Sequence, residues 1–128
     1  MKKIIRALSI LLILVFSSSL LVGCGNNVPE TKMDAITKLI NADFTYIADN
    51  TAEDGTLVIM FNEKLENGSS MPITLYLYPT VNAAKVSAEE INANKENSPV
   101  LAIKNATVKY YGKWVLVGSE KAHEAFVK

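Results

Sequence analysis

Residues 106–119, ATVKYYGKWVLVGS, carry the sequence signal that decides the fold. Two runs rich in β-branched and aromatic residues, which favour strands, lie on either side of Gly112-Lys113. A glycine at the first position of a two-residue connection is typical of the turn that joins two antiparallel strands. The sequence therefore predicts a β-hairpin in which Tyr111 lies opposite Trp114.

The alternation of side chains along this hairpin predicts its two faces. One face is apolar and is expected to lie against the core; it carries Val108, Tyr110, Val115 and Val117. The other face carries Lys109, Tyr111, Trp114 and Leu116. The second face combines large aromatic rings with a positive charge, which makes it a candidate surface for recognition.

Three further segments upstream of the hairpin are predicted to be strands, because they are rich in β-branched and aromatic residues. They are residues 44–48, 56–61 and 73–79, whose sequences are FTYIA, TLVIMF and ITLYLYP. Polar segments with glycine, asparagine or proline separate them and are expected to form turns. Residues 100–103, VLAI, are expected to form a further short strand.

Two segments have the spacing of helices. In residues 31–42, an apolar stripe is expected to consist of Met33, Ile36, Leu39 and Ile40. Thr31 is expected to cap the start of this helix, with Asp34 three residues further on. In residues 80–97, Thr80 is expected to be the N-cap, and the buried stripe is expected to consist of Ala84, Ala88 and Ile91.

The start of the second helix has an alternative. Ser87 and Glu90 have the spacing of a capping box and would support a later beginning. One long helix over residues 80–97 is the favoured interpretation. A short helix is also expected at the end of the chain, over residues 120–128.

The predicted order of elements is α-β-β-β-α-β-β-α. Strands joined by short turns favour an antiparallel arrangement, so the fold class is expected to be α+β. We expect a mostly antiparallel sheet of about five strands with the helices packed on one face. Residues 31–128 are long enough to form this single domain without metal or disulfides.

The N-terminal residues differ in kind from the rest. MKKIIR carries three basic residues and no acid, and the segment from Ala7 to Gly23 contains no charge. A basic start followed by an apolar run and a small residue is typical of a secretory signal peptide. The run then ends in Leu21-Val22-Gly23-Cys24, and Cys24 is the single cysteine of the chain.

This ending closely resembles the lipobox of bacterial lipoproteins: an aliphatic residue, a tolerant position, a small residue and a cysteine. The resemblance covers residues 1–25. It implies that residues 1–23 are a signal peptide, that Cys24 carries a diacylglyceryl group, and that the protein lies at the extracytoplasmic face of the cell membrane. Residues 24–30 would be a short tether. An uncleaved N-terminal anchor and a structural cysteine are the alternatives.

The charge of the chain bears on its partners. Residues 1–23 contain three of the 13 basic residues and none of the 13 acidic ones, so the remainder has a net charge of about −3. A mildly acidic domain argues against nucleic acid as a partner, because phosphate contacts need a basic patch. The same charge argues against a second, electrostatic attachment to anionic lipid.

No catalytic, metal-binding or cofactor-binding residues are predicted. His123 is the single histidine and is expected to be a solvated helix residue. Acylation of Cys24 would leave the domain without a thiol nucleophile. Asp49, Glu53 and Asp54 supply oxygen donors, but their loop does not match the spacing of an EF-hand and is interpreted as a hairpin turn.

The aromatic residues remain as candidates for recognition, because Tyr and Trp bury much area at a low cost in entropy. The candidate partner-binding set is Tyr76, Tyr78, Lys109, Tyr111 and Trp114. The alternative is that these rings form cross-strand pairs that stabilise the sheet, or that the helices cover them.

The sequence thus predicts a non-enzymatic, membrane-anchored extracytoplasmic lipoprotein that binds a protein of the cell envelope or serves as its accessory module. Two alternatives stay open. One is an inhibitor of an extracellular hydrolase, which would use a loop such as residues 67–72 or the Gly112 turn. The other is an exclusion-type lipoprotein of a phage or plasmid.

Overall fold

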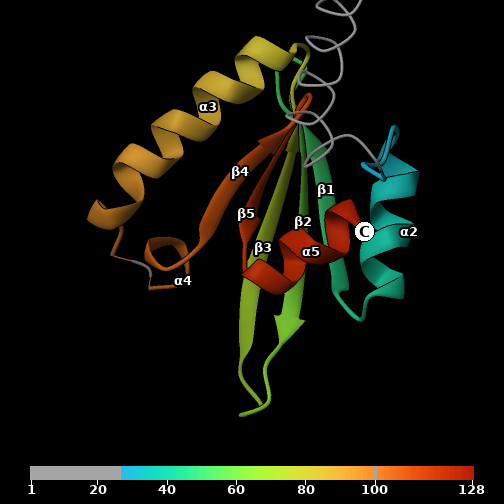
Figure 1. Ribbon diagram of the computed structural model, residues 1–128, viewed down its shortest axis with the longest axis vertical. Helices are drawn as coiled ribbons and strands as arrows, with labels where there is room; N and C mark the ends of the chain where they lie inside the picture. Colours follow the sequence, from blue (N-terminus) through green and yellow to red (C-terminus); the bar gives the residue numbers. More distant parts are fainter. Residues whose placement is uncertain (1–26, 100) are drawn as a thin grey trace, which may run out of the picture.

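The computed structural model describes residues 27–99 and 101–128. The predicted signal peptide, the lipobox and Cys24 lie outside the described residues. Within the described part of the chain, no helix is both long and apolar enough to cross a membrane. The predicted α+β class is confirmed, and so is the five-stranded antiparallel sheet (Figure 1). The strands are β1 (Thr45–Thr51), β2 (Leu57–Lys64), β3 (Ser70–Leu77), β4 (Thr107–Tyr111) and β5 (Trp114–Gly118).

The spatial order of the strands is β1-β2-β3-β5-β4. β1, β2 and β3 follow one another through short turns. The chain then crosses from β3 through α3 (Val81–Asn94) to β4 at the far edge, and it returns through β5, which pairs with β3. β1 and β4 are therefore the two edge strands, and β4 has a partner on one side only.

The hairpin of β4 and β5 has the predicted register. Tyr111 lies opposite Trp114, and Val108 lies opposite Val117. Gly112 has a φ of 61°, a left-handed value that a side chain disfavours and that a two-residue hairpin turn with glycine first requires. The conformational preference of the Gly112-Lys113 turn therefore determines the register of the hairpin formed by β4 and β5.

The prediction that the helices pack on one face is wrong. Figure 1 shows α3 on one side of the sheet, with α2 (Lys32–Asn41) and α5 (Glu120–Val127) on the other. All five residues of β5 are buried, so both faces of this strand need cover. A continuous apolar run such as WVLVG is typical of a strand that is covered on both faces.

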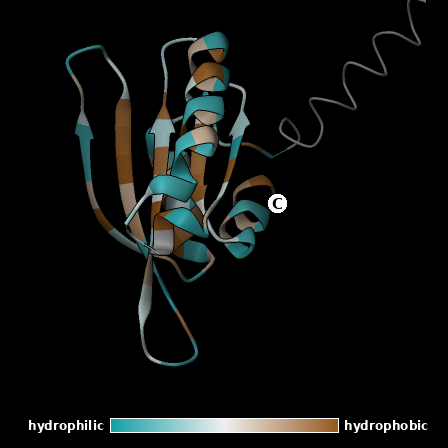
Figure 2. Ribbon diagram, turned by 90° about the vertical axis from the view of Figure 1, so that its left-hand side faces the viewer, coloured by the Kyte–Doolittle hydropathy of each residue, from teal (hydrophilic) through white to brown (hydrophobic). Residues whose placement is uncertain are grey.

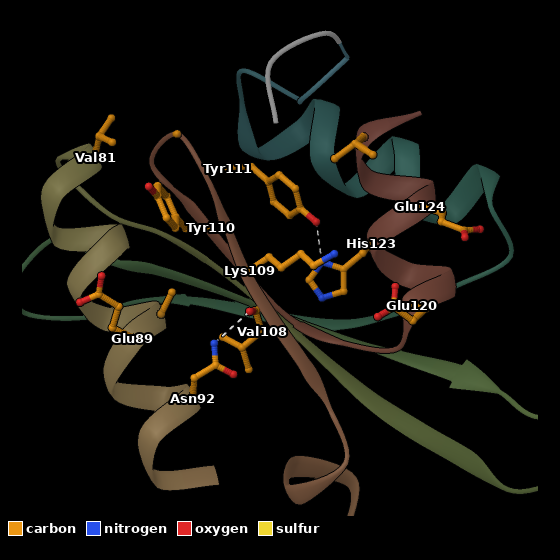
Figure 3. A pocket seen from close by; sticks show the side chains of 13 residues that line it. Val81, Glu89, Asn92, Val108, Lys109, Tyr110, Tyr111, Glu120, His123 and Glu124 are labelled. Carbon is orange, nitrogen blue, oxygen red and sulfur yellow. Dashed lines mark hydrogen bonds between the residues drawn. The ribbon is translucent and has the colours of Figure 1, made fainter. Parts of the chain in front are cut away.

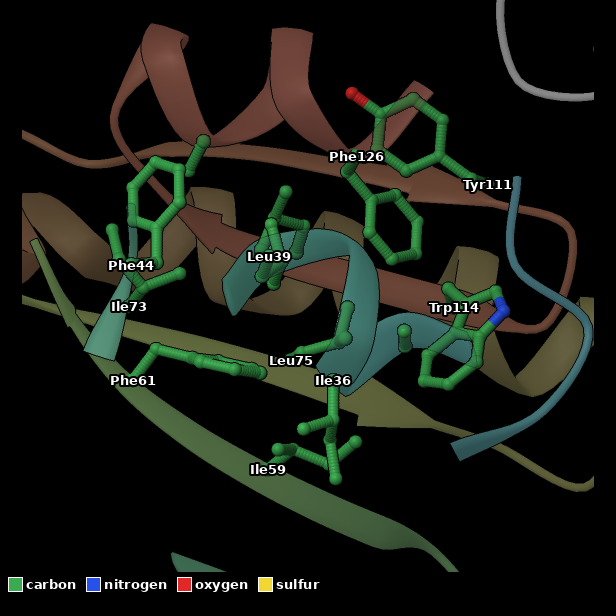
Figure 4. Close-up of a cluster of buried hydrophobic side chains, with 13 residues drawn as sticks. Ile36, Leu39, Phe44, Ile59, Phe61, Ile73, Leu75, Tyr111, Trp114 and Phe126 are labelled. Atoms are coloured by element: carbon green, nitrogen blue, oxygen red, sulfur yellow. The ribbon is translucent and has the colours of Figure 1, made fainter. Parts of the chain in front are cut away.

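The larger hydrophobic core lies between the sheet and the pair α2 and α5 (Figure 4). Phe126 from α5 is fully buried and packs its ring 5.6 Å from Trp114 and 5.5 Å from Tyr111. The smaller core lies under α3 and consists of Ala84, Ala88, Ala106, Val108, Val115 and Val117. Figure 2 views the sheet from the α3 side and shows hydrophobic strands behind this amphipathic helix.

The helix starts were predicted correctly. The hydroxyl oxygens of Thr31 and Thr80 accept hydrogen bonds from the backbone N–H groups of Asp34 and Ala83, each at 3.1 Å. α3 is therefore one long helix, and it is followed by a 3-10 turn, η1 (Lys95–Asn97). Ser87 is not a cap; its hydroxyl is hydrogen-bonded to the Tyr78 hydroxyl.

Two local predictions are wrong. Residues 101–104 form a short helix, α4 (Leu101–Lys104), where a strand was expected; Val100 lies outside the described residues. In α2, the buried residues are Ala35, Ile36 and Leu39, while Met33 is 62% exposed and Ile40 is 47% exposed. The small side chain of Ala35 lets α2 pack closely, so the buried stripe centres on this residue.

Candidate functional site

The predicted aromatic surface does not form. Tyr111 is 5% exposed and Trp114 is 3% exposed, and both belong to the larger core, beneath α5. Tyr76 and Tyr78 pack against the smaller core on the opposite face of the sheet. The register explains the separation, because Tyr76 lies opposite Val115 and therefore shares the face that α3 covers. Lys109 remains on the face of Tyr111 but lies in the groove described below.

Tyr76 and Tyr78 support the packing of α3. Their ring centroids are 6.0 Å apart, and the Tyr78 hydroxyl is bonded to Ser87 of α3. Burial, and then the neighbouring Tyr78, raise the pKa of Tyr76 above its usual value. Both side chains are half-buried, and their contacts with each other and with α3 describe a structural role better than a binding role.

Tyr111 has a polar partner in the core, which is His123 (Figure 3). The Tyr111 hydroxyl lies 2.7 Å from Nδ1 of His123, and Nε2 of His123 lies 2.7 Å from the carbonyl oxygen of Thr107. A carbonyl oxygen can only accept, so Nε2 carries the proton and Nδ1 accepts from Tyr111. Both ring nitrogens are thus engaged within the protein.

The prediction of a solvated His123 is wrong, because this residue is only 3% exposed. Burial lowers its pKa below the usual value; the Thr107 carbonyl opposes that shift, and the nearby Lys109 adds to it. The sequence did contain a signal for this placement. Ala122, His123 and Phe126 form the buried stripe of α5 at helical spacing.

A groove runs along the outer edge of β4 (Figure 3). Its volume is about 750 Å³, and residues of α3 form one wall while residues of α5 form the other. β4 forms the floor between them. Three carboxylates line this groove, those of Glu89, Glu120 and Glu124, against the single amine of Lys109. The groove therefore has acidic walls, and its floor combines the side chains of Val108 and Tyr110 with the amine of Lys109.

The backbone of β4 is oriented to receive a further strand. Tyr111 and Trp114 flank the two-residue turn and exchange backbone hydrogen bonds, so alternate residues of β4 direct their N–H and C=O groups away from β5. Those residues are Val108 and Tyr110. The Val108 carbonyl accepts a hydrogen bond from Nδ2 of Asn92 at 3.1 Å, and no described strand pairs with the outer side of β4.

Tyr110 lies at the mouth of this groove. Its side chain is 39% exposed, although the sequence placed it in the core with Val108. It lines the groove together with Val81 of α3. An exposed tyrosine beside an open strand edge offers both a ring and backbone groups to a partner.

Among the described residues, no group of three or more His, Cys, Asp or Glu side chains lies close enough together to hold a metal ion. The carboxylate of Asp49 has partners within the protein. Asp49 accepts a hydrogen bond from Tyr46 and forms an ion pair with Lys32 at 3.2 Å. These two partners, Tyr46 first, hold the pKa of Asp49 below its usual value.

No protein-family model, curated protein or solved structure matches this chain.

Proposed function

We propose that this chain is a membrane-anchored extracytoplasmic lipoprotein whose folded domain is not an enzyme and binds a second protein of the cell envelope. The observation that carries the binding role is the open edge of β4 between α3 and α5. The anchor rests on the resemblance of Leu21-Val22-Gly23-Cys24 to a lipobox. Two acyl chains on Cys24 would hold the domain firmly, because each buried methylene contributes about 0.8 kcal/mol.

The bound segment would add to the sheet as a strand along β4. Main-chain hydrogen bonds to an open edge supply affinity in this mode of recognition, and side chains that alternate between the two walls supply specificity. Val108 and Tyr110 direct backbone groups outward. The Val108 carbonyl already accepts from Nδ2 of Asn92, so the added strand would pair with the Val108 N–H group and with the N–H and C=O groups of Tyr110. Because α3 and α5 stand on either side of β4, only an extended segment of the partner would reach the open edge of this strand.

The charge of the groove favours a basic partner. Glu89 stands on the α3 wall, and Glu120 and Glu124 stand on the α5 wall. Successive side chains of an added strand would point alternately to these walls. Lysine or arginine residues of the partner would therefore find a carboxylate on either side, and an acidic segment would be repelled.

The test is capture of envelope proteins from solubilised membranes by the full chain, with paired variants. Glu89→Lys reverses a charge inside the groove, whereas Glu90→Lys reverses the next charge on α3, which is exposed but does not line the groove. We expect a partner that is retained by Glu90→Lys and lost by Glu89→Lys. A partner that both variants bind equally would contradict the proposal.

A second pair tests the backbone contribution. Tyr110→Pro removes an outward N–H group and leaves the hydrogen bonds between β4 and β5, because proline is tolerated at an open edge. Tyr110→Ala removes the ring and keeps the N–H group. Strand addition predicts weaker binding by the proline variant than by the alanine variant. Homodimerisation of this chain through β4 would instead identify a second copy as the occupant.

A further inference from the structure

A second hollow lies on the other side of α5, between this helix and α2, and has a volume of about 840 Å³. Its charge is opposite in sign to that of the β4 groove, because three lysines and one carboxylate line it. The lysines are Lys38 on α2, Lys121 on α5 and Lys128 at the end of the described chain; the carboxylate is that of Glu124. Phe44 also lines this hollow, and its ring centroid lies 5.8 Å from the Lys121 ammonium.

This hollow lies where the tether joins the domain. Nδ2 of Asn27 donates a hydrogen bond to the backbone oxygen of Lys128 at 2.7 Å, and the Asn27 carbonyl accepts one from the Lys38 ammonium. Two of the three lysines therefore touch Asn27. Asn27 is three positions from Cys24, so the chain between them spans about 11 Å at most. An acyl group on Cys24 would hold this face close to the bilayer.

We propose that the lysine face formed by Lys38, Lys121 and Lys128 docks on the anionic phospholipid headgroups of the membrane that anchors the chain. The inference rests on the proposed anchor at Cys24. Ammonium groups bind phosphate oxygens as point charges, and their attraction to an anionic surface acts within a Debye length of about 8 Å at physiological salt. The short tether, about 11 Å at most, would keep the cluster at a distance comparable with this length.

For docking on a membrane, the charge of the face that meets the lipid matters more than the net charge of the domain. The net charge of the domain argues against such attachment, but the fold gathers Glu89 and Glu120 at the β4 groove and the three lysines at the tether, while Glu124 lines both hollows. Docking through the lysine face would fix the orientation of the domain on the membrane. It would leave the wall of α5 that carries Glu120 directed toward the β4 groove, away from the lipid.

The experiment uses purified full-length protein from membranes, incorporated into vesicles of phosphatidylcholine alone or with one third phosphatidylglycerol. Flotation of the vesicles first measures anchoring, which should be independent of lipid charge. Amine labelling read by mass spectrometry then reports the access of reagent to each lysine. Lys85 on α3 and Lys113 in the hairpin turn serve as exposed internal controls.

We expect labelling of the three lysines to fall about fivefold in the anionic vesicles, the factor to which ~1 kcal/mol per lysine corresponds. High salt should restore the labelling, and the two control lysines should not change. Equal labelling in both kinds of vesicle would overturn the proposal. So would protection by inorganic phosphate in vesicles of phosphatidylcholine alone, which would identify a site for a free ion. Protein that does not float with vesicles would instead contradict the anchor itself.

Discussion

The indole Nε1 of Trp114 donates a hydrogen bond of 2.7 Å to the carbonyl oxygen of Pro29, across 85 residues of sequence. Trp114 is buried in the larger core, so this bond fixes the segment that enters the domain to the interior of the fold. A tether to the proposed anchor at Cys24 would therefore be shorter than residues 24–30, because Asn27 and Pro29 are both held by the domain. A domain attached in this way would have a restricted orientation relative to that anchor.

The first prediction concerns this bond. Trp114→Phe keeps an aromatic ring in the core but leaves the Pro29 carbonyl without its donor. We expect a loss of about 1–3 kcal/mol in the free energy of unfolding, since a buried acceptor would lose its partner. Urea denaturation measures the loss, and hydrogen exchange at residues 27–30 should accelerate. Unchanged exchange there would show that the bond does not hold the tether.

The second prediction concerns pH. Because the pKa of His123 is lowered in the folded protein from the usual 6.5, the unfolded chain binds the proton more readily. This contribution to stability is complete above pH 6.5 and is lost as the pH falls below it. The charged groups near His123 are Lys109 from β4 and Glu120 from its own helix. Urea denaturation at pH 7.5 and 5.5 should show lower stability at pH 5.5.

The control for this effect is His123→Gln, which removes the titrating group. Its stability should depend less on pH over the same interval. Asp49 and Asp54 do not interfere, because hydrogen bonds lower their pKa values further below the interval. A wild-type protein that is equally stable at both pH values would contradict the buried, neutral His123.

The third prediction concerns Gly118 in β5. A Cβ atom at this position would lie 2.6 Å from Cδ1 of Ile73, well inside van der Waals contact. Gly118→Ala should therefore cost about 1–3 kcal/mol of stability through overpacking. Ile73→Val removes the clashing methyl group, so the double variant should lose less stability than the two single changes added together. Additive losses would contradict the predicted contact.

The fourth prediction contrasts two positions of α2. Ile36→Ala removes a buried side chain and should cost about 2–5 kcal/mol, whereas Met33→Ala changes an exposed one and should stay within about 0.5 kcal/mol. Thermal or chemical unfolding distinguishes them. Equal losses would show that Met33 is buried, as the apolar spacing alone suggested.

Local chemistry made much of this fold predictable. The glycine of the Gly112-Lys113 turn determined the register of one hairpin, and the hydroxyls of Thr31 and Thr80 determined two helix starts. The position of β5 between β3 and β4 was not predictable in this way, because either strand of a hairpin can pair with its neighbour.

The candidate site was less predictable than the fold. Tyr111 and Trp114 have the composition of a recognition surface, but α5 covers them, and neither periodicity nor turn chemistry says on which face a terminal helix lies. The β4 groove arises from the placement of α3 and α5 around an edge strand. Glu89 and Glu124 are 35 positions apart in the sequence, and only the tertiary structure brings them to one groove.

The measurement that tests the account most directly is the intact mass of the protein extracted from membranes, beside that of a Cys24→Ala variant. A lipid-anchored protein would give a wild-type chain that begins at Cys24 and carries the mass of a diacylglyceryl group. The variant should be unprocessed or released from the membrane. A wild-type chain with residues 1–23 still attached and Cys24 unmodified would contradict the anchor and, with it, the location from which the domain is proposed to act.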